Sequence, residues 1–302
     1  MKVLNLVNKE ESDIRYEVSK FPDGQQSVNI LNSVVGTTLH TLQNENTDIQ
    51  IKSRLNDFRD LELIICVNTA LRNLGLTNVH LYTPYFIGGR SDRKFTEGGV
   101  NYLKDVISPI INSQGFKSVK VLDPHSDVIE ATVQNFQKEN NLKLVKWALS
   151  KIDNTNEARE KVTLISPDAG ALKKVFDVAQ NFEIDKLIIA SKHRDIKTGN
   201  ITHTEVPNLE KYDDGNKFVI IDDICDGGRT FIELSKVIKE RLPNAKIYLI
   251  VTHGIFSGGL KPFRGYFDKI YTTNSYRTIT SMNEWGAYNE RYLGLVEQFN
   301  IF

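Results

Sequence analysis

The sequence contains little cysteine and no long apolar run, and both absences narrow the class of protein. Its 302 residues include only two cysteines, Cys66 and Cys225, which are too few for a disulfide framework or a cysteine-based zinc site. No stretch approaches the roughly 18 apolar residues of a transmembrane helix, and the first residues lack the apolar core of a signal peptide. These features predict a cytoplasmic protein that does not enter a membrane.

The chain also lacks net charge, because 38 basic residues balance 38 acidic ones. A neutral chain is a poor general ligand for nucleic acid or for an anionic membrane surface, although a local anion site stays open. Hydrophobic residues make up 40% of the chain and charged residues 25%, as in ordinary globular proteins. At this length two domains are the default expectation.

Short apolar runs rich in β-branched residues alternate with segments of helical spacing. We predict the runs to be buried strands of parallel sheets. They occupy residues 63–67, 79–83, 119–122, 162–165, 187–190, 218–221, 247–251 and 270–271. Helical stripes occupy residues 100–111 and 231–242, the second ended by Pro243. The alternation predicts an α/β fold of two doubly wound domains with mainly parallel sheets, divided into residues 1–145 and 146–302.

Charged and glycine-rich segments follow the predicted strands. In an open α/β sheet, ligands bind at the carboxyl ends of the strands, so these segments are expected to form a site. They occupy residues 87–94, 123–127, 166–170, 191–195, 222–230 and 252–254.

The segment 222–230, which reads DDICDGGRT, lies between a predicted strand and a predicted helix. Its glycines let the backbone turn tightly, and Thr230 adds a hydroxyl where the N–H groups and dipole of a helix start favour a phosphate. The carboxylates of Asp222 and Asp223 repel a phosphate and suit the hydroxyls of a sugar or a sugar-bound Mg²⁺. A phosphate and a diol on one loop indicate a ribose phosphate. The alternative is a plain turn whose acids cap the helix.

Other residues after the predicted strands suit a nucleotide and its metal. His125 and Asp168 are candidate ligands of a Mg²⁺ carried with a nucleotide polyphosphate, although a lone histidine after a strand is commonly structural. Lys192 and Arg194 open a polar stretch to about Thr204 that is either a solvated loop or a mobile lid. A lid would bring its cations to a transferring phosphoryl group.

A basic run at residues 90–94 contains Arg90 and Asp92. Elsewhere in a fold such a run is usually a solvated turn. At the carboxyl end of a strand it suits the phosphates of ATP or the adenine.

In their order along the chain, these motifs resemble the ribose-phosphate pyrophosphokinase (phosphoribosyl pyrophosphate synthetase) family. Each block alone is weak, but the ordered set is specific. The matching blocks occupy residues 21–25, 90–94, 122–125, 166–170, 192–194, 222–230, 252–253 and 273–275. The resemblance implies two phosphoribosyltransferase-like domains related by duplication, an N-terminal one on the ATP side and a C-terminal one on the ribose-phosphate side.

The activity implied by the resemblance is transfer of the β,γ-diphosphate of MgATP to the anomeric hydroxyl of ribose 5-phosphate, giving phosphoribosyl pyrophosphate and AMP. Lys192 and Arg194 would be catalytic, and His125 and Asp168 would lie at the Mg²⁺. The implied ATP-binding residues are Asp23, Gly24, Gln25, Arg90, Ser91 and Asp92, the first three reaching a neighbouring subunit. The implied ribose-phosphate-binding residues are Asp222, Asp223, Asp226, Gly227, Gly228, Arg229 and Thr230. Sharing of the site between subunits implies a homodimer or a homohexamer.

Two departures from the family pattern concern the substrates. Gln25 replaces a glutamate near the nucleotide, which removes a negative charge. Arg229 stands where the family loop, usually Asp-Thr-Gly/Ala-Gly-Thr, has a small residue beside the 5-phosphate. Either its side chain points away from the ligand, or the acceptor has a more anionic 5′ substituent. ADP-ribose, which viral relatives of this family use in rebuilding NAD⁺, would be such an acceptor.

Two other function classes stay open. A phosphoribosyltransferase would use phosphoribosyl pyrophosphate rather than make it, and the 222–230 loop alone would fit that activity. Such an enzyme needs one domain of this kind, however, and does not need the Lys192 and Arg194 block. An inactive regulatory paralogue is the other class, and the presence of the catalytic-type residues speaks against it.

Overall fold

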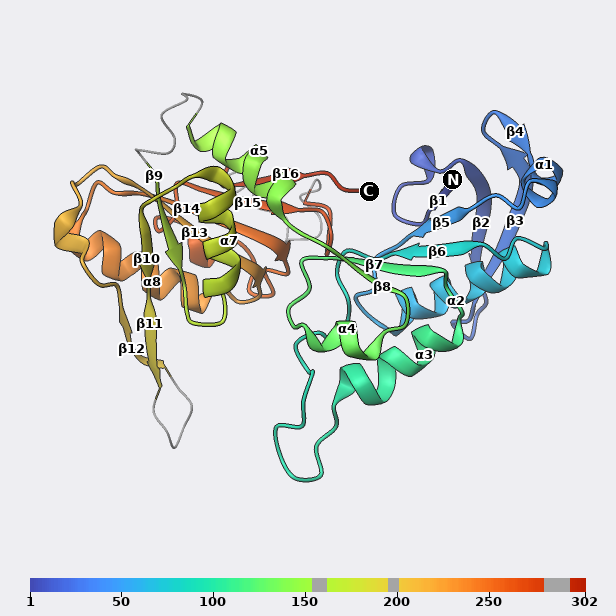
Figure 1. Ribbon diagram of the computed structural model, residues 1–302, viewed down its shortest axis with the longest axis horizontal. Coiled ribbons are helices and arrows are strands. Elements are labelled where there is room, and N and C mark those ends of the chain that lie inside the picture. Colours follow the sequence, from blue (N-terminus) through green and yellow to red (C-terminus); the bar gives the residue numbers. More distant parts are fainter. Residues whose placement is uncertain (154–161, 195–200, 280–293) are drawn as a thin grey trace. The chain divides into compact units, whose positions relative to one another are not determined.

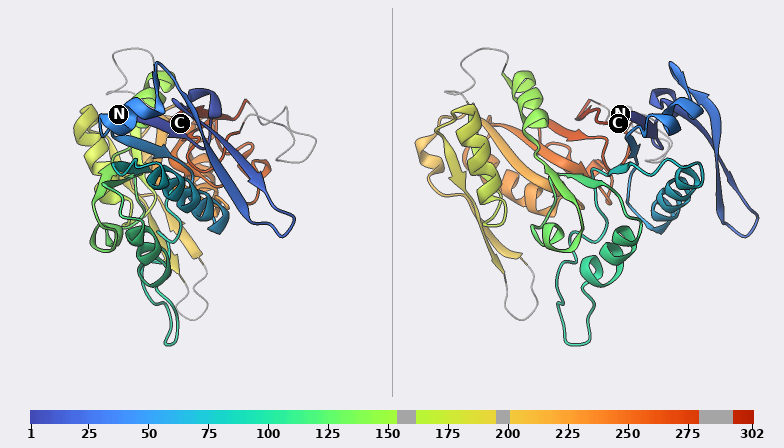
Figure 2. Two further views of the ribbon diagram at one scale, coloured as in Figure 1. Left: turned by 90° about the vertical axis from the view of Figure 1, so that its right-hand side faces the viewer. Right: turned by 45° about the vertical axis from the view of Figure 1, so that its right-hand side comes forward.

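The computed structural model describes residues 1–153, 162–194, 201–279 and 294–302 (Figure 1, Figure 2). Side chains at 192–194 and 201–203 also lie outside that description. The chain divides into two compact units, Met1–Asn140 with Phe302 and Asn141–Ile301. The predicted domain boundary after residue 145 stays a prediction.

The first unit is built on a five-stranded parallel sheet in the order β1-β5-β6-β7-β8. Its strands are β1 (Lys2–Asn5), β5 (Ile49–Lys52), β6 (Val79–Tyr82), β7 (Ser118–Leu122) and β8 (Phe136–Glu139). Its helices are α1 (Leu39–Asn44), α2 (Phe58–Asn73), a π-helical turn (Leu103–Ile107), α3 (Ser108–Ser113) and α4 (Val128–Thr132). A separate antiparallel sheet holds β2 (Ile14–Lys20), β3 (Gln26–Val34) and β4 (Thr37–Thr38).

The strand predicted at residues 63–67 is wrong, because these residues lie inside α2. Asp57 caps this helix by accepting from the N–H groups of Arg59 and Asp60. A short apolar run fits a buried strand and a buried helix turn equally well, and here the wider pattern decides. The apolar side chains that α2 buries recur every three or four residues, at Leu61, Ile64, Val67 and Leu71.

The second unit is built on a six-stranded parallel sheet in the order β10-β9-β13-β14-β15-β16. Its strands are β9 (Val162–Ser166), β10 (Leu187–Ile189), β13 (Lys217–Cys225), β14 (Lys246–Gly254), β15 (Lys269–Thr273) and β16 (Val296–Phe299). Its helices are α5 (Leu142–Ile152), α7 (Leu172–Phe182) and α8 (Arg229–Arg241). An antiparallel ribbon of β11 (Ser191–Arg194) and β12 (Ile201–Glu205) follows β10.

Alternation along β13 explains why helices cover both faces of this sheet. Val219 and Ile221 belong to the apolar cluster that includes residues of α5 and α7. Phe218 and Ile220, which point the opposite way, belong to the cluster that includes residues of α8. The next two side chains, Asp222 and Asp223, therefore leave the strand on opposite faces. Asp223 therefore faces the side of the sheet that α5 and α7 cover, and Asp222 faces the side that α8 covers.

The predicted α/β class with mainly parallel sheets is confirmed. Sequence reasoning missed the parallel strands β1, β5, β8 and β16, each four residues long with at most two apolar residues. It also missed the antiparallel strands β2, β3, β4, β11 and β12. Strand β8, with the mostly polar sequence FQKE, lies at the edge of its sheet. Within the described ranges, no helix has the length and apolarity needed to cross a membrane.

Candidate active site

The predicted strand–loop–helix is confirmed, since β13 ends at Cys225 and α8 begins at Arg229. Gly228 is the N-cap of α8 and has φ 77°, a left-handed conformation that favours glycine. Its carbonyl accepts from the N–H groups of Phe231 and Ile232, each at 3.0 Å. A glycine cap has no side chain to satisfy the N–H groups of the first turn, so the helix start is suited to an anion.

An aromatic cluster supports this loop from behind. A Cβ atom on Gly228 would lie 2.0 Å from Cζ of Phe263, so the ring occupies the space of any side chain there. Phe263 is fully buried and packs edge-to-face on Phe256, with ring centroids 5.5 Å apart. The N–H groups of Ile255 and Phe256 donate to the Cys225 carbonyl at 2.9 and 3.0 Å, which ties the loop after β14 to the end of β13.

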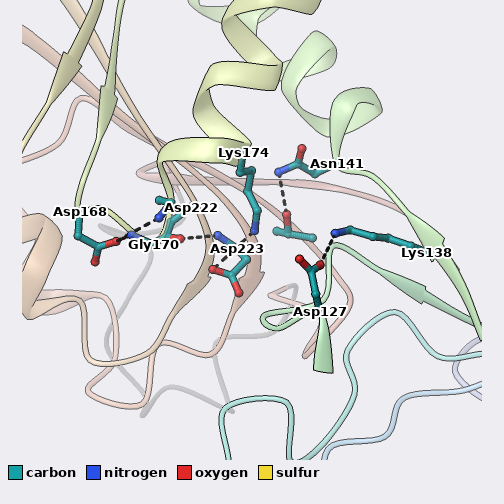
Figure 3. Close-up of polar contacts among 10 residues, drawn as sticks. Asp127, Lys138, Asn141, Asp168, Gly170, Lys174, Asp222 and Asp223 are labelled. Atoms are coloured by element: carbon teal, nitrogen blue, oxygen red, sulfur yellow. Dashed lines mark hydrogen bonds and ion pairs between the residues drawn. The ribbon is translucent and has the colours of Figure 1, made fainter. Parts of the chain in front are cut away.

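The two acids at the end of β13 differ in their surroundings. The Asp223 side chain is 8% exposed, and its Oδ1 lies 3.7 Å from Nζ of Lys174 in the first turn of α7 (Figure 3). The backbone N–H of Asp223 donates to Oδ1 of Asp222 at 2.9 Å. Burial raises the pKa of Asp222 well above its ordinary value, and the negative charge of the neighbouring Asp223 carboxyl adds to that rise.

Because of this arrangement, we expect Asp222→Asn to stabilise the fold while it impairs the site. The native chain holds a proton at Asp222 that the unfolded chain releases near the ordinary pKa, so wild-type stability falls as pH rises between the two pKa values. Asparagine keeps the oxygen that accepts from Asp223 and does not titrate. Denaturant unfolding at pH 4 and pH 7 measures this, with an expected gain of about 1 kcal/mol at pH 7 and less at pH 4. A variant no more stable than wild type at pH 7 would contradict it.

Asp168 lies in the loop after β9, the strand that pairs with β13 in the sheet. Its Oδ1 accepts from the N–H groups of Gly170 and Ala171 at 3.0 and 3.2 Å (Figure 3). Ser166 Oγ donates to the Asp168 carbonyl at 2.8 Å. The loop therefore holds this carboxylate at the same edge of the sheet as Asp222 and Asp223.

The blocks at residues 252–253 and 273–275 form a buried polar network at the ends of β14 and β15. His253 Nδ1 and Ser275 Oγ are 2.8 Å apart, and Thr273 Oγ1 donates to the Thr252 carbonyl at 2.7 Å. Asn141 Nδ2 donates to Thr252 Oγ1 at 3.3 Å (Figure 3). These residues hold the carboxyl edge of the sheet in shape.

In the first unit, the structure brings together two of the predicted blocks. Arg90 and Ser91 lie in the loop after β6, and exposed His125 lies in the turn after the neighbouring β7. A Cβ atom on Gly89 would lie 3.9 Å from Cβ of His125. The β7 turn also carries Asp127, whose Oδ1 pairs with Nζ of Lys138 at 3.0 Å. Arg90 and His125 thus share the carboxyl edge of this sheet.

The other predicted ATP-binding block, Asp23 to Gln25, is on a separate sheet. Asp23 and Gln25 lie in the exposed turn between β2 and β3, where Asp23 Oδ1 accepts from the Gln25 N–H at 3.1 Å. The Phe21 N–H donates to the Gln25 carbonyl at 2.9 Å, and Gly24 has φ 101°. The turn is therefore a closed hairpin end and not part of the edge that holds Arg90.

The predicted catalytic pair lies on strand β11, in the antiparallel ribbon. The backbone of Lys192 pairs with Thr204 and that of Arg194 with Ile201. The side chains of both residues, and all of residues 195–200, lie outside the described part of the chain. Their catalytic role and the predicted lid stay predictions.

The chemistry of the acidic side chains bears on the predicted Mg²⁺ site. Among the described residues, no three His, Cys, Asp or Glu side chains gather as a metal site. Mg²⁺ commonly keeps several waters and binds through one or two carboxylates together with substrate phosphates. Asp168 suits that role. The acidic side chains here therefore fit a Mg²⁺ ion that arrives with a nucleotide better than one enclosed by protein ligands alone. His125 belongs to the other unit, and its pairing with Asp168 at a metal stays a prediction.

Sequence reasoning missed Lys174, the cation beside Asp223. The sequence did contain a signal for such a cation. Two adjacent acids at a buried strand end are costly in free energy unless a cation lies nearby. Lys174 lies in the first turn of the helix that follows Asp168, which places it at this edge.

Comparisons with known proteins agree with this geometry. The family model described as "Phosphoribosyl transferase domain" matches residues 133–285, slightly more than half of the chain. A ribose-phosphate pyrophosphokinase of Marinomonas sp. (strain MWYL1) is 28% identical over 241 residues, covering 80% of this chain and 71% of that protein. One of Sulfurisphaera tokodaii is 25% identical over 264 residues, covering 87% and 84%.

Among solved structures, phosphoribosylpyrophosphate synthetase from Mycobacterium smegmatis has the same fold, with a TM-score of 0.74 at 16% identity. The match covers 97% of this chain and 88% of that one. The predicted resemblance is confirmed, at a divergent level of identity. The chain therefore belongs to the phosphoribosyl transferase domain family, and its homologues are ribose-phosphate pyrophosphokinases, a family of transferase enzymes.

Proposed function

We propose that this protein transfers the β,γ-diphosphate of MgATP to the anomeric hydroxyl of ribose 5-phosphate, giving phosphoribosyl pyrophosphate and AMP. The observation that carries the proposal is the end of β13. There the two adjacent acids, Asp222 and Asp223, precede a glycine-capped helix start, and Asp168 lies in the loop after the neighbouring strand β9. The homologues of this chain are named ribose-phosphate pyrophosphokinases, which supports the choice of reaction.

Each part of this edge has a chemical role in the proposal. The N–H groups at the start of α8 and the Thr230 hydroxyl bind the 5-phosphate. The acids at the end of β13 accept hydrogen bonds from the ribose hydroxyls and orient the sugar. Mg²⁺, held with ATP near Asp168, would neutralise charge on the transferring phosphates. Lys192 and Arg194 would stabilise the charge that develops during transfer, and Arg90 would bind the nucleotide.

The test is a chromatographic assay of AMP after incubation of the protein with MgATP and ribose 5-phosphate. AMP is expected only when acceptor, nucleotide and Mg²⁺ are all present, and EDTA is expected to abolish it. A second arm supplies phosphoribosyl pyrophosphate and nucleobases in place of ATP and ribose 5-phosphate. Nucleotide formation in that arm, without AMP release in the first, would replace the proposal with a phosphoribosyltransferase activity.

ADP-ribose is the second candidate acceptor, and one observation favours it. Arg229 is the first residue of α8, and its side chain is exposed beside the Gly228 cap. A guanidinium at this helix start adds positive charge where the 5′ substituent of the ribose would lie. A diphosphate would gain more from that charge than a single phosphate.

We therefore expect Arg229→Gly to raise the use of ribose 5-phosphate relative to ADP-ribose by about 10-fold, the loss of one charged contact. Competition between the two acceptors, with mass-spectrometric detection of both products, measures the ratio directly. Arg241→Gly, at the exposed last residue of the same helix, is the matched control and leaves the ratio unchanged. An unchanged ratio for Arg229→Gly would remove this residue from acceptor selection.

The exposed β2–β3 turn supports a proposal about assembly. Asp23, Gly24 and Gln25 lie on a sheet of their own, and they would bind ATP by completing the site of a neighbouring copy. The proposed unit is a homodimer or a homohexamer. Its mass in solution, from light scattering, is the measurement that distinguishes these from a monomer.

A further inference from the structure

The end of β13 presents a charge problem that the proposed function alone does not explain. Binding a phosphate does not require two adjacent acids. Burying both carboxylates costs free energy unless a cation or hydrogen bonds offset that cost. Asp223 is 6% exposed as a residue, more buried than Asp222. Of the two acids, Asp222 is the more accessible to a ligand, and Asp223 lies behind it on the side of α7.

Lys174 reaches this buried carboxylate from α7. Its Nζ lies 3.7 Å from Asp223 Oδ1, and its own side chain is only 23% exposed (Figure 3). The neighbouring Val175 is fully buried in the cluster that includes α7 and β13, so the helix is fixed against the sheet at this point. A partly buried ion pair on a packed helix holds its partners in one geometry more firmly than a solvated pair does.

Asp223 in turn contacts Asp222 through its backbone. Its N–H donates to Asp222 Oδ1 at 2.9 Å. The position of the Asp222 carboxyl therefore depends on that of Asp223. Lys174, the residue Asp223 and the Asp222 carboxyl thus form a chain of contacts from α7 through the buried acid to the accessible one.

We infer that Lys174 is a positioning residue, which orients the carboxyl pair of Asp222 and Asp223 for the ribose hydroxyls. It acts through Asp223 and does not touch the substrate. The inference rests on the proposed ribose-phosphate site and adds a residue that determines affinity for the sugar. Since the ammonium lies behind the acids, nucleotide binding does not depend on it.

The experiment compares Lys174→Met, Lys174→Arg and wild type in the full chain, with ribose 5-phosphate and MgATP varied separately. For Lys174→Met the KM for ribose 5-phosphate rises about 10- to 100-fold while the KM for ATP stays within about 2-fold, as expected when one partner of a partly buried ion pair is removed. Lys174→Arg, which keeps the charge, restores most of the affinity. Lys173→Met is the matched control, because Lys173 is the exposed neighbour on the same helix, and it changes neither KM.

A double-mutant cycle separates positioning from a merely structural role. In an Asp223→Asn background, Lys174→Met raises the KM for ribose 5-phosphate by less than about 2-fold further, since the contact through which it acts is already lost. Equal and additive effects in both backgrounds, or equal rises in both KM values, would overturn the inference. Thermal unfolding of each variant identifies any that fail to fold.

Calorimetric titration with ribose 5-phosphate alone keeps this test independent of the proposed reaction. Weaker binding to Lys174→Met than to wild type supports the positioning role even if no AMP is ever released. Equal binding overturns it even if wild type releases AMP. Loss of AMP formation in wild type bears on the proposed function only.

Discussion

Gly228→Ala is expected to cost about 3 kcal/mol of stability and to abolish ribose-phosphate binding. Two effects combine at this position. The left-handed backbone, with φ 77°, disfavours any side chain, and the new Cβ would lie 2.0 Å from Cζ of Phe263. Phe263 is fully buried between Phe256 and Phe267, so the ring has little room to yield.

Gly75→Ala is the matched control for this variant. Gly75 also has φ 77°, but nothing lies within 4 Å of the Cβ that a substitution would add. Gly75→Ala therefore measures the loss of unfolding free energy caused by the left-handed backbone alone, which is expected to be about 1 kcal/mol. Denaturant unfolding of both variants measures the difference. Equal losses would show that the ring behind the loop does not constrain it.

Replacement of Phe263 tests the same contact from the other side. In a Phe263→Leu background, the Gly228→Ala change meets a shorter side chain and is expected to cost less than it does in wild type. The two changes are therefore expected to be non-additive. If the changes in unfolding free energy simply add, the methyl group that Gly228→Ala introduces does not meet the ring, and Phe263 does not support the loop.

Lys192→Ala is expected to lower kcat by about 10³-fold or more with little change in thermal stability, as when a cation at a transferring phosphoryl group is removed. The residue lies on β11, immediately after the sheet edge that carries Asp168 and Asp222. Single-turnover AMP formation under saturating substrates measures the chemical step without contributions from product release.

Lys211→Ala is the control for general charge loss in the same unit, because Lys211 is exposed in a short turn after the ribbon. It is expected to keep full activity. A Lys192→Ala rate within about 10-fold of wild type would exclude the transition-state role. A large loss of thermal stability would assign the effect to folding instead.

The local structure of the candidate site could be predicted from sequence where it depends on one continuous stretch of chain. The loop of residues 222–230 carries its turn, its helix start and its acids in one continuous stretch, and β13 and α8 flank it as expected. The order of blocks along the chain also predicted the family that the comparisons identify.

What could not be predicted depends on side chains that meet across elements. Lys174 and Phe263 are ordinary residues of α7 and of the turn after β14, and only the packing of the sheet brings them to Asp223 and Gly228. Local ambiguity explains the error at residues 63–67, where an apolar run inside an amphipathic helix has the composition of a strand. Short, polar edge strands such as β8 give no periodic signal at all.

The proposed reaction differs from simple phosphate transfer in which bond of ATP breaks, and ³¹P NMR distinguishes the two outcomes in one sample. With MgATP and ribose 5-phosphate, we expect the ATP resonances to be replaced by those of AMP and of a diphosphate attached to the ribose anomeric carbon. Appearance of ADP and a ribose bisphosphate, or unchanged spectra with both ribose 5-phosphate and ADP-ribose, would contradict a pyrophosphokinase activity.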